Sequence, residues 1–268
     1  MRSTLLVAIH VFRDSVRDKV LYSIVAFAII LMASSFLMGQ LTAGQDVKII
    51  KDLGLAAMSL FGLFIAIFIG VGLVSREIER RSIYAVLAKP VLRHEFIVGK
   101  YLGLVGTLFV NLAVMAIAYY GVLEYMALTL PAGAFTGGPP ATDPRLLLAV
   151  GLIGAELALV TAIALFWSSF SSSALLSAAF TAGLWVAGQF GADLRNFDQV
   201  VASPVAVWLA RGLYYVLPNF AAFDIKAQVV HGATVSGDYM AATLAYAMAY
   251  IAMLIVAAVL VFSRRDFK

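Results

Sequence analysis

Six apolar runs of about 20 residues each constrain this chain more than any other feature of its sequence. They cover residues 20–38, 53–74, 101–123, 146–167, 171–190 and 239–262. A helix needs about 20 mainly apolar residues to cross the hydrocarbon core of a bilayer, where backbone polar groups must be satisfied within the helix. The runs therefore predict an all-α polytopic membrane protein with six transmembrane helices.

The composition supports a chain that lies in the lipid bilayer over its whole length. Hydrophobic residues make up 63% of it and charged residues only 13%, whereas soluble domains are about half apolar and a quarter charged. No stretch between the runs exceeds roughly 50 residues, which leaves no room for a separate soluble domain of ordinary size. We therefore expect a single transmembrane domain over residues 1–268.

The net charge of +4 could suggest a nucleic-acid partner, but the basic residues sit in short segments beside the apolar runs. If the N-terminus is cytoplasmic, 13 of the 19 Lys and Arg residues lie on the cytoplasmic side. The positive-inside rule then places both termini in the cytoplasm. We expect a multi-pass protein of the bacterial plasma membrane that binds no nucleic acid.

The residues that commonly build catalytic and metal sites are scarce. There is no cysteine, and His10, His94 and His231 lie far apart in the sequence. Disulfides and thiolate metal sites are therefore excluded, and no HExxH pair occurs. A membrane-embedded enzyme would need a cluster of acids, bases or metal ligands within the spans. We expect no metal and no catalytic residue.

Two segments outside the runs have an apolar character of their own. In residues 1–19, Leu5, Ile9, Phe12 and Val16 recur at helical spacing, which predicts an amphipathic helix on the cytoplasmic membrane surface. Residues 193–238 are long but rich in apolar and aromatic side chains, and they favour short helices that lie on or dip into the outer interface. An outer aromatic belt is expected to contain Trp185, Trp208, Tyr214 and Tyr215.

Glycines recur where close packing of helices would need them. Gly54, Gly62 and Gly70 are spaced by eight residues along the second run, and Gly99 and Gly103 form a small-xxx-small pair at the start of the third. Small residues let helix backbones approach closely inside membranes. We predict that these glycines mark helix contacts and no ligand site.

The segment between the second and third runs is charged and has the pattern of a short helix over residues 75–90. Glu77 and Glu79 would lie in its first turn, Lys89 in its last, and Pro90 would end it. Such a helix could insert into a cytoplasmic partner and transmit movement to the spans. It could equally be a solvated loop whose basic residues only set topology.

This segment resembles the permeases of the ABC-2 transporter family. The family pattern is roughly Glu-x-Glu-x-Gly-Thr, then Pro-Val-x-Arg, then Gly-Lys followed by Tyr or Phe. Arg81 stands where the family has glycine, and Ser82 where it has threonine. The residues that carry the resemblance are Glu77, Glu79, Ser82, Pro90, Val91, Arg93, Glu95, Gly99, Lys100 and Tyr101.

The resemblance implies an ABC-2 permease fold of the type V exporter-like kind, in a homodimer or heterodimer. Each subunit would dock on a separate ABC ATPase that binds ATP and Mg²⁺, because this chain has no GxxxxGK[ST] loop. The surface toward the ATPase would comprise Glu77, Glu79, Arg80, Arg81, Ser82 and Tyr84.

A second resemblance concerns the outer region. Leu217-Pro-Asn-Phe220, followed by Phe223 and Asp224, is similar to the multi-copper-enzyme-maturation (NosY-like) group of permeases. This likeness says little about the cargo, and the export direction is implied by the ABC-2 resemblance.

Three polar residues fall inside the predicted spans. Glu156 lies in the middle of the fourth run, where a charged carboxylate costs about 2.5–3.5 kcal/mol on insertion scales. It could line a substrate path or couple protons, or it could be a neutral carboxyl bonded to Asn111 or to nearby backbone. Asn111 and Gln189 are typical interhelical hydrogen-bond formers. Glu156 leaves a proton-coupled secondary transporter or channel as the alternative function.

Overall fold

The computed structural model describes residues 2–39, 46–79, 92–129, 140–171, 173–191 and 204–264, and every regular element in these ranges is a helix. The longer helices are α1 (Arg2–Val16), α2 (Lys19–Gly39), α3 (Asp46–Glu79), α5 (Arg93–Thr129), α6 (Leu146–Phe170), α7 (Ala174–Gln189) and α11 (Gly237–Arg264). The outer region contributes α9 (Pro204–Val216), the short 3₁₀ helix η3 (Phe220–Phe223) and α10 (Lys226–Val230). The predicted all-α fold is confirmed.

Among the described residues, four helices are long and apolar enough to cross a bilayer: Val47–Gly72, Arg93–Thr129, Leu146–Phe170 and Gly237–Ser263. The other two predicted spans are also helical, but α7 has only 16 residues. At 1.5 Å per residue it extends about 24 Å, less than the ~30 Å hydrocarbon core. It starts late because Ser173 has extended backbone and caps it, with its side chain accepting a hydrogen bond from the Leu176 backbone N–H.

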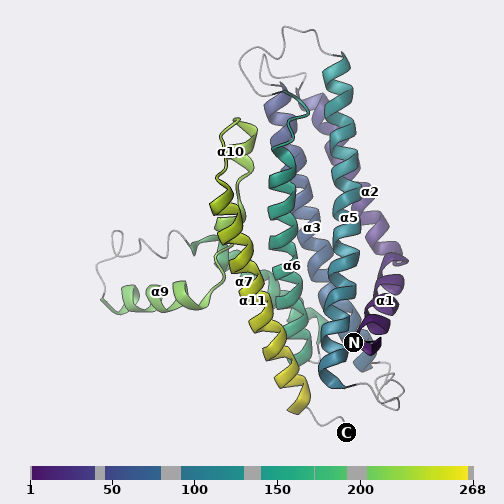
Figure 1. Ribbon diagram of the computed structural model, residues 1–268, viewed down its shortest axis with the longest axis vertical. Helices are drawn as coiled ribbons and strands as arrows, with labels where there is room; N and C mark the ends of the chain where they lie inside the picture. Colours follow the sequence, from purple (N-terminus) through teal and green to yellow (C-terminus); the bar gives the residue numbers. More distant parts are fainter. Residues whose placement is uncertain are drawn as a thin grey trace.

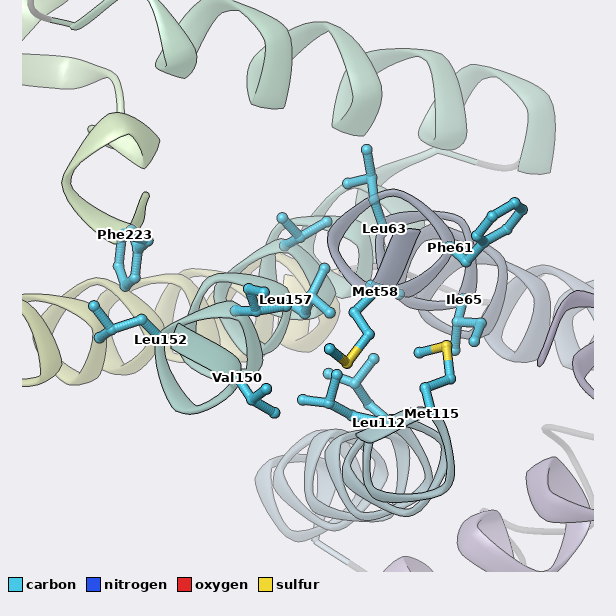
Figure 2. Packing of buried hydrophobic residues seen from close by; sticks show 14 of the residues in the cluster. Met58, Phe61, Leu63, Ile65, Leu112, Met115, Val150, Leu152, Leu157 and Phe223 are labelled. Atoms are coloured by element: carbon cyan, nitrogen blue, oxygen red, sulfur yellow. The ribbon is translucent and has the colours of Figure 1, made fainter. Parts of the chain in front are cut away.

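Helices α3, α5 and α6 form the centre of the bundle, with α1 and α2 on one side and α11 on the other (Figure 1). Figure 2 shows Met58 of α3, Leu112 of α5 and Leu157 of α6 pointing toward one another, all within the buried core. Phe61 of α3 points away from this centre. One apolar face of α3 therefore packs in the core against α5 and α6, and another faces α2.

The glycines of α3 confirm the close packing that their spacing predicts. A Cβ atom on Gly62 would collide with the Leu157 side chain, and one on Gly70 would collide with Ala164 Cβ, both on α6. Gly54 lies in the same way against the Tyr119 ring of α5. Since every second turn of α3 lacks a side chain on this face, its neighbours approach its backbone directly.

Helix α1 forms where the sequence predicts it, and it packs along the start of α5. The face that contacts α5 contains Ala8 and Val11, both buried. Leu5 and Ile9, part of the predicted apolar stripe, are 61% and 41% exposed. Phe12 and Val16, the other members of this stripe, are partly buried, so only the first half of the stripe is exposed.

The end of the bundle opposite α1 is held by hydrogen bonds that converge on residues 140–145. Lys51 Nζ of α3 donates to Pro140 O at 2.7 Å, and Tyr120 Oη of α5 donates to Asp143 O at 3.1 Å. Arg145 Nη1 donates to Gly232 O, after α10, at 2.9 Å. These bonds join α3, α5 and the α10 turn at the end of the bundle opposite α1.

The predicted outer region 193–238 contains α9, η3 and α10, and residues 192–203 lie outside the described residues. Figure 1 shows α9 projecting sideways from the bundle, across the direction of the long helices. Its Trp208 is 74% exposed. Helix α1 and the end of α11 lie at the same end of the bundle (Figure 1).

Candidate functional site

The predicted coupling segment, residues 75–90, begins as a continuation of α3. This helix runs without interruption from Asp46 to Glu79, so Glu77 and Glu79 lie in its last turn. They were expected in the first turn of a separate helix over 75–90, and the start of that helix was placed wrongly. No proline interrupts residues 70–79, which allows the helix to continue through them. Arg80, Arg81, Ser82 and Tyr84 lie outside the described residues.

Helix α5 follows this segment. Its first residue, Arg93, belongs to the family pattern and is bound to the last helix, α11. Arg93 Nη1 donates hydrogen bonds to the carbonyl oxygens of Phe262, at 3.2 Å, and Ser263, at 2.7 Å. The Phe96 ring stacks on Phe262 with 5.8 Å between centroids, and Lys100 Nζ lies 4.9 Å from the Phe96 centroid. Arg93 therefore caps the C-terminus of α11, where a cation is favourable.

The following motif residues fasten α5 to two other helices. A Cβ atom on Gly99 would lie 2.6 Å from the Thr4 carbonyl oxygen of α1. Tyr101 Oη donates to Ala158 O of α6 at 3.2 Å. Arg93, Gly99 and Tyr101 thus connect the start of α5 to α11, α1 and α6, respectively.

Replacing Arg93 with alanine is expected to fray the end of α11. Hydrogen bonds from charged groups contribute about 1.5–3 kcal/mol each, so amide exchange in the last turn of α11 should accelerate about 10-fold or more. Hydrogen–deuterium exchange with mass spectrometry would measure it, with the first turns of α11 near Tyr239 as an internal control. If amide exchange in the last turn of α11 is as slow in Arg93→Ala as in the unaltered chain, Arg93 does not hold this terminus.

Glu156 is the centre of a buried polar cluster between α6 and α7. Its side chain is 3% exposed, and Oε1 accepts hydrogen bonds from Trp185 Nε1 at 2.8 Å and Gln189 Nε2 at 3.2 Å. Trp185 and Gln189 are four residues apart and share one face of α7. The cluster therefore joins the short helix α7 to the centre of the bundle.

Among the partners that the sequence leaves open for Glu156, Asn111 is not the one found in the structure. Asn111 Nδ2 donates to Thr107 O, one turn earlier in its own helix, at 2.8 Å. Gln189 takes its place, and Trp185, expected only in the aromatic belt, is the second donor. The i, i+4 spacing of two donors on α7 was the signal in the sequence, but the facing helix could not be deduced from it.

An apolar groove, which no sequence pattern indicates, lies between α2, α3 and α7. It has a volume of about 920 Å³, and its lining includes Phe27, Phe61, Phe64 and Leu175. Phe27 and Phe61 meet edge to face at 5.5 Å. Ser23 also lines the groove, but its hydroxyl donates to Lys19 O at 2.9 Å. The groove can therefore bind a hydrocarbon group with little competition from polar atoms.

Comparison with known proteins gives one match of nearly full length. A family model described as ABC-2 family transporter protein matches residues 5–267. The match covers α1, the coupling segment, the outer region and α11. No curated protein matches the chain.

Proposed function

The chain belongs to the ABC-2 family of transporter proteins and is a membrane subunit of an ABC transporter, and we propose that it is the permease of an exporter. ATP hydrolysis on a separate ABC ATPase chain would drive the movement of substrate. ATP and Mg²⁺ would bind to that partner, because this chain has no phosphate-binding loop. The export direction and the likeness to the NosY-like group rest on sequence resemblance.

The proposal rests on the way in which the coupling segment is connected to the long helices α3, α5 and α11. Helix α3 reaches Glu79 as one continuous helix, and α5 restarts at Arg93, which is bound to the end of α11. A displacement of the coupling segment would therefore be transmitted to α3, α5 and α11. We propose that Glu77, Glu79, Arg80, Arg81, Ser82 and Tyr84 form the surface toward the ATPase.

The proposed complex contains two permeases, either identical or different, in the bacterial plasma membrane. Both termini would face the cytoplasm, which puts the coupling segment on the side where an ATPase can bind. Residues 1–19 would lie along the inner membrane surface and residues 193–238 at the outer one. The substrate route would run between the two permeases.

The proposal is tested by purifying the tagged chain from its native membrane under mild conditions. An ABC ATPase should co-purify with the unaltered chain and be lost from the double variant Glu77→Arg with Arg81→Glu. Asp238→Lys is the matched control, since it reverses an exposed charge at the opposite end, and it should retain the ATPase. Absence of any ATPase from the unaltered chain would contradict the proposal.

A proton-coupled secondary transporter receives no further support from Glu156. That residue is the only ionisable one in α6, whereas proton relays use several such groups in a chain. Its Oε1 atom is engaged by two donors of α7, which is the arrangement of an interhelical contact.

A further inference from the structure

A pocket lined by tyrosines lies between the outer region and the first half of α11. It has a volume of about 430 Å³, and its lining comes from the end of α9, the turn before η3, η3 itself and α11. Among the described residues, it shares none with the apolar groove or with the Glu156 cluster. Five of the chain's 11 tyrosines line it: Tyr214, Tyr215, Tyr239, Tyr246 and Tyr250.

Three of these tyrosines share one face of α11, because about two turns separate residue 239 from 246 and about three separate it from 250. Their hydroxyls bind the backbone of the outer region. Tyr239 Oη donates to Ala222 O at 2.7 Å. Tyr250 Oη donates to Val216 O, at the end of α9, at 3.3 Å. Tyr246 Oη accepts a backbone N–H of the turn before η3 at 2.8 Å. These bonds hold the three rings in place before any ligand binds.

The rings of the pocket are inclined to one another. The planes of Tyr246 and Tyr250 meet at 50°, with 4.9 Å between centroids. Those of Tyr214 and Tyr215, on α9, meet at 73°, with 5.3 Å between centroids. A flat ligand can stack on only one ring of such a pair, whereas a compact, rounded group can touch both. The arrangement therefore favours a rounded group over a planar ring.

The electrostatics of the rings favour a positively charged group. The face of an aromatic ring is negative, and a cation within about 6 Å of the ring centroid is attracted to it. The hydroxyls of three rings already bind backbone groups. A primary ammonium group would lose its hydrogen bonds to water without full replacement, whereas a quaternary ammonium group has no N–H to satisfy.

We propose that this pocket binds a quaternary ammonium group of the choline type. Such groups are recognised by aromatic rings that surround the cation. In the proposed orientation the first half of α11 lies in the outer half of the membrane, where the group could belong to a lipid or to a free solute. The inference adds a ligand site to the chain and does not depend on the proposed export function.

Binding is tested on the purified full chain in a maltoside detergent, which carries no charge. Choline is the probe, and saturation-transfer NMR of its N-methyl signal measures binding, with protein-free micelles as the blank. Two competitors separate the contributions: 3,3-dimethylbutan-1-ol is the neutral isostere of choline, and ethanolamine keeps the charge without the methyl groups. We expect choline to bind about 10-fold more tightly than either.

Equal binding of the neutral isostere would overturn the proposal, because the rings would then act only as an apolar surface. Equal binding of ethanolamine would also overturn it, because the pocket would then accept any ammonium group.

A pair of variants on α11 locates the site. Ala242 lines the pocket and is exposed, so Ala242→Leu should fill the pocket and abolish choline binding while the fold persists. Ala241→Leu is the matched control, since Ala241 is the preceding residue, is also exposed and does not line the pocket. It should bind choline like the unaltered chain. Unchanged affinity in Ala242→Leu would overturn the assignment.

A second pair separates the ring from its hydroxyl. The side chain of Tyr215 is 79% exposed, so neither substitution should disturb the fold. Tyr215→Leu should weaken choline binding about 3-fold, and Tyr215→Phe should retain it, because the ring face attracts the cation in both tyrosine and phenylalanine. Equal losses in the two variants would show that the hydroxyl binds the ligand, which contradicts the proposal.

Dihexanoylphosphatidylcholine, below its micelle concentration, identifies the source of the ligand. If it displaces choline at lower concentrations than choline itself, the site holds a lipid head group. If it displaces choline only at higher concentrations, the site holds a free solute. Both results support a quaternary ammonium site. The assay needs neither ATP nor an ATPase, so its failure leaves the co-purification test of the transporter complex unaffected.

Discussion

Replacing Gly103 with leucine is expected to detach α1 from α5 and to destabilise the protein by about 3 kcal/mol. A Cβ atom at this position would lie 2.6 Å from the Ala8 carbonyl oxygen and 2.8 Å from Val11 Cβ, both on α1. The backbone of α1 cannot rotate away as a flexible side chain could, so the whole helix must move. Thermal unfolding in detergent would measure the loss of stability.

The absence of native cysteine allows the displacement of α1 to be followed directly. Ala8 is 9% exposed, and a cysteine introduced there should react slowly with a maleimide unless α1 has moved. We expect rapid labelling in Gly103→Leu and slow labelling in Gly121→Leu, which adds the same side chain to the same helix in open space. Slow labelling in both Gly103→Leu and Gly121→Leu would show that the backbone of α1 does not pack closely against Gly103.

Replacing Glu156 with leucine should have the second large effect. The substitution leaves the Trp185 and Gln189 donors without their acceptor in a partly buried region between α6 and α7. Each unpartnered donor costs about 1–3 kcal/mol, so we expect a loss of about 2–5 kcal/mol, measured by thermal unfolding. Helix α7 should loosen first, and hydrogen exchange in α7 would show it.

Glu156→Gln is the informative comparison, because its side-chain carbonyl can still accept from Trp185 and Gln189. If the cluster is an interhelical contact, this variant should keep nearly full stability, and its transport activity, measured once the cargo is known, should be close to that of the unaltered chain. A stable Glu156→Gln protein with no transport would instead assign Glu156 an ionisable role, which is the reading that a proton-coupled mechanism requires.

Much of the fold could be predicted because the bilayer restricts the possible structures. An apolar run of sufficient length must be helical when lipid offers no partner for its backbone, and the four longest helices follow from this rule alone. The length of α7 did not follow, because hydropathy does not show that Ser173 caps the helix. Helical spacing likewise could not show that α3 continues to Glu79.

The candidate site, too, could be predicted only in part. The motif around Arg93, Gly99 and Tyr101 could be recognised in the sequence, but its contacts with α11, α1 and α6 could not. Partners 169 or 170 residues away, as for Arg93, are set by how the helices pack, and no local pattern records them.

The sequence by itself determined the all-α membrane fold, the helical character of each apolar run, the small residues at helix contacts and the family. These depend on local composition and spacing, which the bilayer converts directly into structure. Only the tertiary structure decided that Glu156 pairs with Trp185 and Gln189, that Arg93 caps α11, and that an apolar groove lies between α2, α3 and α7. Those features arise where separate helices meet, and helix packing depends on side-chain shapes from distant parts of the chain.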